Sequence, residues 1–257
     1  MNFAKLARRV APIAALAAAT ALSGCGDMDI TINGEEGVPL SELDMSGDAP
    51  TGVAMGGSDS VVITTGDEFT IDVDGSDEAV ERMRFVLSEG SLAILRDNES
   101  SSGGGSATVL ITMPAPSMLI MGGSGSIEAD TMASSAEIVV GGSGSVSVTS
   151  IEADSLEVMI GGSGSATTSG TADRLEVTIG GNGSANMADL QVERAEVNIG
   201  GSGSARFASD GRVEANIGGS GTVYVTGSAS CEANTIGSGS LVCEEAAETE
   251  EAVEEGA

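Results

Sequence analysis

The sequence predicts an all-β protein, a parallel β-helix or β-solenoid with coils of 18–20 residues. A Gly-Gly-Ser-Gly-Ser motif recurs, and successive copies begin 19, 20, 19, 20 and 18 residues apart. A fixed period in this range is typical of stacked repeats. Two short strands with alternating apolar and polar residues fit in each period, which predicts stacked coils, with right-handed winding expected. Aromatic residues make up only 2% of the chain, and a coil core of Val, Ile, Leu and Ala does not need them.

The glycine motif predicts the corners of these coils. Glycine turns a chain where φ is positive or where another backbone comes close. A flexible linker is the other interpretation of such a sequence, but a linker would not hold apolar residues in register. The copies begin at Gly122, Gly141, Gly161, Gly180 (with Asn182 in place of serine), Gly200 and Gly218, and a shortened copy spans residues 236–240.

The strands before each motif align in columns. Apolar and polar columns alternate with period two, so the apolar side chains are expected to face inward. The inward columns are Ala136, Leu156, Leu175, Ala195, Val213 and Cys231, then Ile138, Val158, Val177, Val197, Ala215 and Ala233, then Val140, Ile160, Ile179, Ile199 and Ile217. The outward columns are Glu137, Glu157, Glu176, Glu196, Glu214 and Glu232, then Val139, Met159, Thr178, Asn198, Asn216 and Asn234.

Residues 1–24 are expected to be a lipoprotein signal peptide. Lys5, Arg8 and Arg9 make its start positive, and the alanine-rich run that follows is too short for a normal membrane span. Leu22-Ser23-Gly24-Cys25 resembles a bacterial lipobox, although an ordinary secretory signal with an incidental cysteine would also fit.

The lipobox predicts that Cys25 carries acyl chains, such as palmitate, that attach the protein to a membrane. Gly26 follows it, and by the sorting rule of enterobacterial lipoproteins this favours the outer over the inner membrane. Residues 25–50 are acidic and without periodicity, so we expect a flexible tether, followed by a domain at residues 51–243. Residues 244–257 are an acidic tail that we expect to be disordered.

Strand patterns begin at Thr51, before the repeats. Residues 78–87 fit a short helix or a strand, and the alternation of Met83, Phe85 and Leu87 favours a strand. The other expected strands span residues 61–64, 69–73, 92–95 and 107–113.

Together these segments resemble the bacterial GIN domain, described as the head domain of an auto-transporter adhesin. The resemblance rests on Val61-Val62-Ile63-Thr64-Thr65-Gly66, on Gly90-Ser91-Leu92-Ala93-Ile94, and on the strand into Pro114 that precedes the repeats from Gly122. It covers about residues 51–243. The resemblance implies a β-helical fold, a cell-envelope location and an adhesive role, and it carries over no catalytic residues.

Charge and composition narrow the possible functions. From residue 25 the chain has 39 acidic and 7 basic residues and no lysine, which argues against binding nucleic acid or anionic lipid through a basic patch. With no histidine, the usual general bases are missing, so we expect a non-catalytic protein without a cofactor. Two alternatives remain: an enzyme that acts on polysaccharide through carboxylate pairs, and an envelope-homeostasis factor that binds a periplasmic protein.

Metal binding through the repeats is not expected. The motif resembles the start of the calcium-binding GGxGxD repeat, which needs an aspartate at its sixth position. The residue at that position is instead apolar in every copy: Ile127, Val146, Ala166, Ala185, Ala205 or Val223.

The outward columns are candidate binding surfaces. Glutamates stacked ~4.8 Å apart repel each other by ~1 kcal/mol per neighbouring pair in water. Arg174, Arg194 and Arg212 lie two residues before three of them and are expected to relieve part of this repulsion. The glutamate column is a solvated face or a weak site for cations or a basic partner. Asn198, Asn216 and Asn234 are likewise solvated or contact a glycan or protein ligand.

Cys231 and Cys243 remain as a pair once Cys25 carries lipid. Both fall at inward positions near the last coil, and an exported chain permits a disulfide. We expect a bridge that staples the C-terminal end, with two buried thiols as the alternative.

Overall fold

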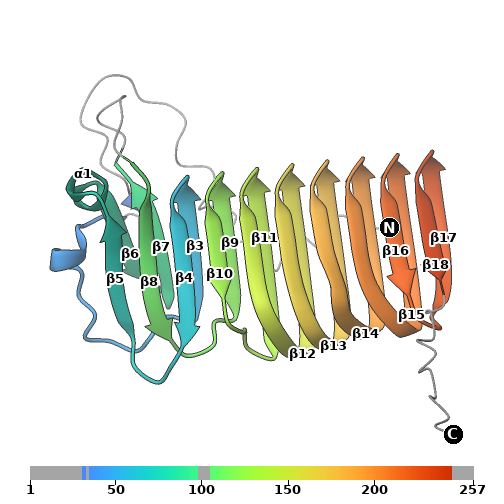
Figure 1. The fold of residues 1–257 in the computed structure, drawn as a ribbon, viewed down its shortest axis with the longest axis horizontal. Helices are drawn as coiled ribbons and strands as arrows, with labels where there is room; N and C mark the ends of the chain where they lie inside the picture. Colours follow the sequence, from blue (N-terminus) through green and yellow to red (C-terminus); the bar gives the residue numbers. More distant parts are fainter. Residues whose placement is uncertain (1–30, 33–34, 98–104, 245–257) are drawn as a thin grey trace, which may run out of the picture.

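The computed structural model is an elongated, flattened β-solenoid (Figure 1). The structure describes residues 31–32, 35–97 and 105–244. Its elements are β1 (Thr31–Ile32), β2 (Glu35–Glu36), η3 (Leu40–Glu42), β3 (Gly52–Gly57), β4 (Ser60–Thr65), β5 (Thr70–Gly75), α1 (Asp77–Glu81), β6 (Met83–Ser88), β7 (Ser91–Arg96), β8 (Ala107–Met113), β9 (Met118–Gly123), β10 (Ser126–Ala129), β11 (Ser135–Gly142), β12 (Ser145–Gly162), β13 (Ser165–Gly181), β14 (Ser184–Gly201), β15 (Ser204–Gly219), β16 (Thr222–Thr226), β17 (Ser230–Gly237) and β18 (Ser240–Glu244).

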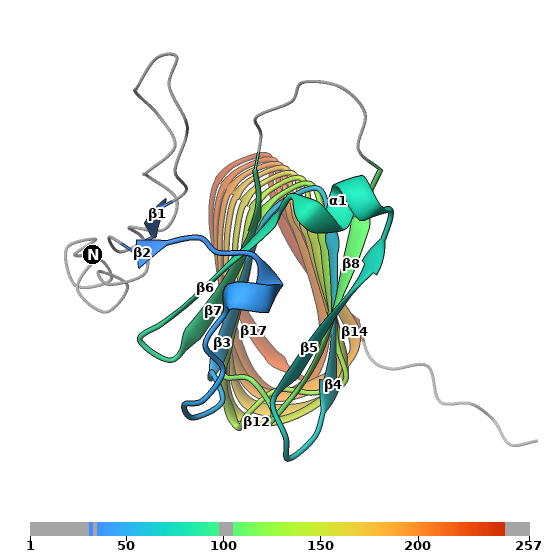
Figure 2. The same cartoon turned by 90° about the vertical axis from the view of Figure 1, so that its left-hand side faces the viewer.

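Each coil contributes strand segments to two opposite faces. Face A contains β6, β7, β3, β9, β11, the second halves of β12 to β15, and β17, in that spatial order. Face B contains β5, β8, β4, β10, the first halves of β12 to β15, β16 and β18. Figure 2 shows the two faces on opposite sides of the solenoid, and the main apolar core lies between them.

The register of the coils confirms the predicted columns. Gly142, Gly162, Gly181, Gly201 and Gly219 pair in succession as corresponding corner positions. The inward residues of the columns are buried as far as Val213, Ala215 and Ile217. Period, parallel pairing and inward faces therefore agree with the sequence analysis.

The spatial order of the first coils departs from the chain order. The coil of β7 and β8 packs on one side of β3 and β4, and the coil of β9 and β10 packs on the other. β5 and β6 then pair antiparallel with β8 and β7 and close the N-terminal end of the solenoid. α1 lies across this end, as Figure 2 shows.

The strand expected over residues 78–87 is wrong in its first part. Asp77–Glu81 forms α1, and the strand β6 begins at Met83. Ser76 caps the helix, because its hydroxyl oxygen accepts a hydrogen bond from the Ala79 N–H at 3.3 Å. The alternation of Met83, Phe85 and Leu87 is a true strand signal, but it begins after this cap.

Part of the segment expected to be a tether packs on the domain. The backbone N–H and carbonyl of Val38 bond to Phe85 at 3.0 and 2.8 Å, and Leu40 and Leu43 contact the core. The signal peptide, Cys25 and residues 245–257 of the acidic tail lie outside the described residues. Within the described part of the chain, no helix is long and apolar enough to cross a membrane.

The C-terminal end carries the predicted disulfide, Cys231–Cys243, which joins β17 to β18. Each cysteine occupies an inward position, in register with Val213 and Val225 of the preceding coil. The bridge therefore spans the last coil from face A to face B.

Candidate functional site

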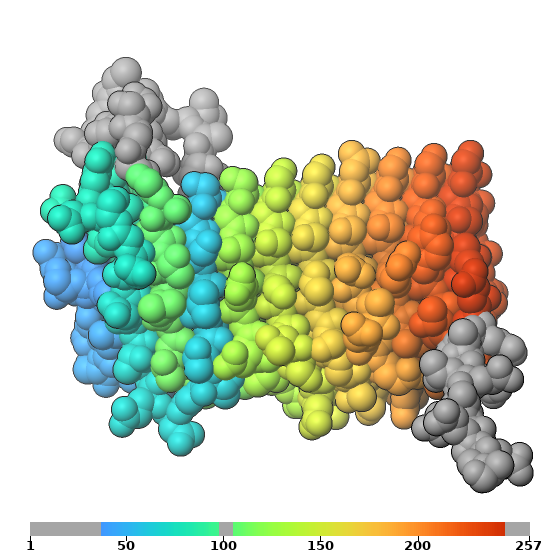
Figure 3. Space-filling view, in the orientation of Figure 1, coloured from blue at the N-terminus to red at the C-terminus, as the bar shows by residue number. Residues whose placement is uncertain are grey.

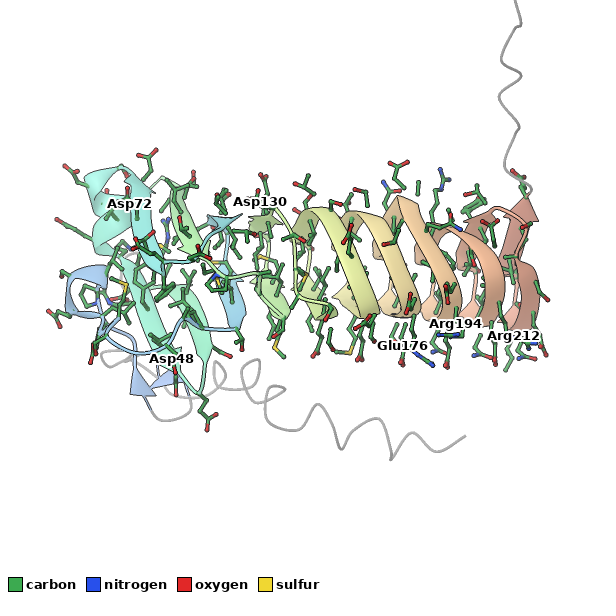
Figure 4. All side chains as sticks on the ribbon, turned by 90° about the horizontal axis from the view of Figure 1, so that it is seen from below. Asp48, Asp72, Asp130, Glu176, Arg194 and Arg212 are labelled. Carbon is green, nitrogen blue, oxygen red and sulfur yellow. A yellow bond between two sulfur atoms is a disulfide. The ribbon has the colours of Figure 1, made fainter. Side chains whose placement is uncertain are left out.

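The six glutamates of the predicted column stand side by side on face A. Each pairs in register with the next, from Glu137 on β11 to Glu232 on β17. Figure 4 shows Glu176 on the same side of the solenoid as Arg194 and Arg212, opposite Asp72 and Asp130. The column is continuous because the coils keep an in-register parallel pairing through this part of every strand.

Burial and mutual repulsion raise the pKa values of the first three glutamates. Burial alone raises the pKa of Glu137. For Glu157, burial and then the charge of Glu137 raise the pKa. For Glu176, burial, Glu157 and Glu196 together raise the pKa by more than Arg174 lowers it. Protonation is therefore easier here than on an isolated surface glutamate.

The arginine column relieves part of this repulsion without direct ion pairs to the glutamates, since Arg174 lowers the pKa of Glu176. Arg174, Arg194 and Arg212 are in register on face A and are exposed. Within the described residues, none of them lies within 4 Å of a carboxylate of the glutamate column, and Arg194 instead approaches Glu193 at 4.0 Å. The arginines are exposed and are therefore accessible to a ligand.

The three asparagines form a hydrogen-bonded ladder beside the glutamates. The side-chain amide of Asn234 donates to Asn216 Oδ1 at 3.3 Å, and that of Asn216 donates to Asn198 Oδ1 at 3.1 Å. Asn198 Nδ2 in turn donates to Glu196 Oε1 at 3.3 Å. Each amide keeps further donor and acceptor capacity, and the ladder fixes its orientation.

Towards the N-terminal end the same outward row becomes apolar. Ile120, Val139 and Met159 are half-buried and precede Thr178 in this row. Face A therefore changes along its length from an apolar stretch to a polar, amide-lined stretch.

A shallow depression of about 520 Å³ lies where β13, β14 and β15 pass from one face to the other. Its polar lining residues include Asp173, Gln191, Glu193, Arg194 and Asp210. The Ser228 N–H and hydroxyl donate to Asp210 Oδ1, both at 2.9 Å, and Gln191 Nε2 donates to Asp210 Oδ2 at 3.0 Å. These bonds, the one from the Ser228 backbone first, lower the pKa of Asp210.

Face B, the side from which Figure 3 views the molecule, carries rows of polar side chains as well. Ser145, Ser165, Ser184 and Ser204 pair in register along one row. The Arg206 guanidinium lies 4.9 Å from the ring centre of Tyr224. Among the residues that the structure describes, no cluster of three or more His, Cys, Asp or Glu side chains is arranged to hold a metal ion.

Sequence reasoning missed a corner in the first coil. Gly56-Gly57-Ser58-Asp59-Ser60 is a copy of the motif with aspartate in place of its third glycine. The Asp59 side chain is fully buried, pairs with Arg96, and accepts the Ala107 N–H at 2.8 Å. The Gly-Gly-Ser at residues 56–58 was the signal that could have revealed this coil.

The fold and these rows define a class of protein: a β-solenoid with two repetitive outer faces and a closed N-terminal end. The chain belongs to the family described as "Putative auto-transporter adhesin, head GIN domain", which matches residues 49–229. This confirms the resemblance inferred from the sequence. No curated protein matches the chain.

Several solved structures share the fold. A "putative adhesin" from Bacteroides fragilis aligns with a TM-score of 0.67 at 16% identity, covering 77% of this chain and 93% of that one. A "putative lipid binding protein" from Parabacteroides distasonis aligns with a TM-score of 0.62 at 21% identity, with the same coverage. A "putative adhesin" from Parabacteroides merdae aligns with a TM-score of 0.60 at 17% identity, covering 77% and 92%. At these identities the likeness establishes the fold.

Proposed function

We propose that this protein is a non-catalytic, lipid-anchored module of the bacterial cell envelope that binds an extended ligand through face A. The observation that carries the proposal is the unbroken pair of polar columns there, the glutamates from Glu137 to Glu232 and the asparagines from Asn198 to Asn234. Family membership supports an envelope location and an adhesive role. Attachment through Cys25 and placement at the outer membrane rest on the sequence of the signal peptide.

The periodicity of face A favours a ligand with repeating polar groups. Chemically equal side chains recur at the strand spacing of ~4.8 Å, so a polymer can make the same contact at several coils. Single contacts of this kind are weak, and their repetition along one ligand raises the overall affinity. Oriented amides with spare donors and acceptors suit the hydroxyl groups of a glycan.

A glycan array with the chain from residue 26 onwards tests this proposal. We expect binding to polysaccharides and little binding to their monomers. Replacing Asn198, Asn216 and Asn234 together with alanine should weaken binding at least tenfold. The matched control replaces Ser147, Thr167 and Asn186 with alanine in an outward column of face B. Equal loss in both variants, or binding to no glycan, would count against the glycan-binding role of face A.

Cell-surface location needs its own test. Protease added to intact cells should cleave an exposed adhesin, whereas a homeostasis factor with a periplasmic partner would be protected. Metabolic labelling with a fatty acid should mark the wild-type protein, and the Cys25→Ser variant should lose the label. Protection from protease together with co-purification of a periplasmic protein would favour the homeostasis factor.

Catalysis on polysaccharide receives less support from the geometry. The carboxylates Asp173, Glu193 and Asp210 line the shallow depression. A glycosidase needs one carboxyl group with a raised pKa as general acid, whereas the pKa of Asp210 is lowered. Incubation with each polysaccharide bound in the array should release no reducing ends. Release that is lost in the Asp210→Asn variant would overturn this part of the proposal.

A further inference from the structure

The last coil leaves both of its strands unpaired on one side. Among the described residues, β17 pairs with β15 and β18 pairs with β16, and neither has a neighbour beyond it. Open edges of this kind are ready to pair with another chain. At the opposite end of the solenoid β5 and β6 are edge strands as well, but the core is covered there, since Ala79, Met83 and Phe85 are fully buried.

The core is also exposed at this end. Ala233 is exposed, whereas Ala215 of the preceding coil is fully buried in the same column. Leu241 is half-buried, whereas Val223 before it is fully buried. Ile236 is 84% exposed, because the shortened motif places it in register with Gly218 on the outer side. One more layer of strands would bury the inward side chains.

The free backbone groups at this edge belong to the inward residues. Ser240 N–H donates to Gly221 O at 3.0 Å, and Gly227 N–H donates to Glu244 O at 2.9 Å, so alternate residues of β18 bond to the preceding coil. Leu241 and Cys243, between them, direct their N–H and C=O groups to the open side. The equivalent inward residues of β17 are Cys231, Ala233 and Thr235.

We propose that this end docks against the same end of a second copy, which forms a closed, two-fold symmetric dimer. A two-fold axis normal to the faces places each β17 antiparallel to the other β17 and each β18 antiparallel to the other β18. The distance from β17 to β18 is the same in both copies, because they have the same last coil, so both strand pairs can form at once. A two-fold interface uses the C-terminal end of both copies, so assembly through this end stops at two copies.

The lengths of the two edge strands select one register. β17 has eight residues and β18 has five, and their overlap is greatest when Asn234 and Val242 lie on the axis. Both residues lie four positions from Ser238 at the corner, so one axis serves both faces. In this register the inward residues make the hydrogen-bonded pairs, Ala233 opposite Thr235 and Leu241 opposite Cys243.

Charge is compatible with this register. Glu232 lies opposite Ile236 of the other copy, and Glu244 lies opposite Ser240, so no two glutamates of the described residues face each other across the axis. The two chains still repel over longer distances, because each carries a large negative charge. Salt screens such repulsion, so association should strengthen with ionic strength.

Sedimentation velocity on the chain from Gly26 to Ala257, which holds every described element, measures the association. We expect a monomer–dimer equilibrium in the micromolar range that shifts at least fivefold towards dimer between about 0.02 M and about 0.5 M NaCl. Thr235→Pro removes an edge N–H without touching the bonds to β15, and it should weaken the dimer at least tenfold. A monomer at all concentrations up to about 200 μM in high salt would overturn the proposal.

Cross-linking tests the register itself. Residues opposite each other in a non-hydrogen-bonded antiparallel pair have Cα atoms ~4.5 Å apart, which a disulfide can span. The Asn234→Cys variant should therefore form a covalent dimer under mild oxidation. Asn216→Cys, the matched control in the same column one coil inward, should stay monomeric on a non-reducing gel. Equal cross-linking of both variants would refute the end-to-end arrangement.

Discussion

Two adjacent glycines in one corner motif have different constraints. Gly181 has φ +131°, and a Cβ there would lie 2.4 Å from the carbonyl oxygen of Gly162 in the preceding coil. Gly180 points outward, and a Cβ there would meet nothing within 4 Å. Gly181 is required by backbone conformation and coil spacing, and Gly180 is not.

Gly181→Ala should therefore cost about 2–4 kcal/mol of unfolding free energy, from strain at positive φ and from the displaced coil. Gly180→Ala, the control, should change it by less than about 1 kcal/mol. Urea denaturation followed by circular dichroism measures both. Equal losses would mean that the outward glycine also has a structural role.

The raised pKa values in the glutamate column give stability a defined pH dependence. A carboxyl group with a raised folded pKa binds its proton more tightly in the folded state, so folding loses stability as pH rises through that pKa. The ordinary glutamate value is 4.5. The pKa of Asp210 is lowered from 3.8, so Asp210 makes the protein lose stability only as pH falls below that value. Melting temperature should thus rise as pH falls from 7 towards the ordinary glutamate value of 4.5.

Glu157→Gln should raise the melting temperature at pH 7, because it removes the charge next to Glu137 and Glu176. After solvent screening we expect about 0.5–1 kcal/mol, or an increase in Tm of roughly 1–3 °C. The control is Glu152→Gln, an exposed residue of β12 outside the column. A lower Tm for Glu157→Gln would indicate that the charge has a favourable partner.

At the scale of elements, the first corner depends on an ion pair in place of a glycine. Asp59 is buried, and Arg96 Nε donates to its Oδ2 at 2.8 Å. Arg96 also donates from Nη1 to Gly105 O at 2.8 Å, so the pair ties β7 and the start of β8 to the corner before β4.

Asp59→Gly restores the repeat motif and yet should destabilise the protein by about 3 kcal/mol, because it leaves the Arg96 charge without its carboxylate. Asp67→Gly, which changes an exposed aspartate, should have a small effect. Thermal unfolding compares the two. A neutral Asp59→Gly would mean that the glycine motif alone is sufficient for the corner.

The disulfide acts on the last coil. Its cysteines are 12 residues apart, a loop for which the chain-entropy model gives ~3 kcal/mol. Coils of a solenoid contact only their neighbours, so loss of the bridge should unfold the end first. Reduction should increase amide exchange in β17 and β18 and leave β13 and β14 unchanged in hydrogen-exchange mass spectrometry. The Cys231→Ser, Cys243→Ser double variant should behave in the same way.

At the scale of the whole molecule, coils should be removable as units. Deleting residues 182–201 joins Gly181 to Ser202, keeps every column in register, and should give a cooperatively folded solenoid one coil shorter. Deleting residues 192–201 removes only the face A half of the coil, breaks the columns, and should abolish the cooperative melt. Circular dichroism and thermal melting measure both variants. Loss of the cooperative melt in the full-coil deletion would contradict the prediction.

The repeat region was predictable because period, corner glycines and apolar columns indicate the same register. The asparagine and glutamate columns follow from that register, and their outward positions were correct. The hydrogen bonds of the asparagine ladder, the distance of the arginines from the glutamates, and the burial behind the pKa shifts depend on side-chain geometry. None of these follows from a period in the sequence.

The coil length, the parallel stacking and the inward columns follow from the sequence alone, and the sequence favours the bridge between Cys231 and Cys243 that the structure contains. Those features are local or periodic, so neighbouring residues specify them. Only the folded chain shows that β7 and β8 lie outside β3 and β4, that β5, β6 and α1 cover the core at one end, and that the core at the other end is exposed among the described residues. These outcomes depend on contacts between segments far apart in the chain, where the period is interrupted and the buried Asp59 pairs with the half-buried Arg96.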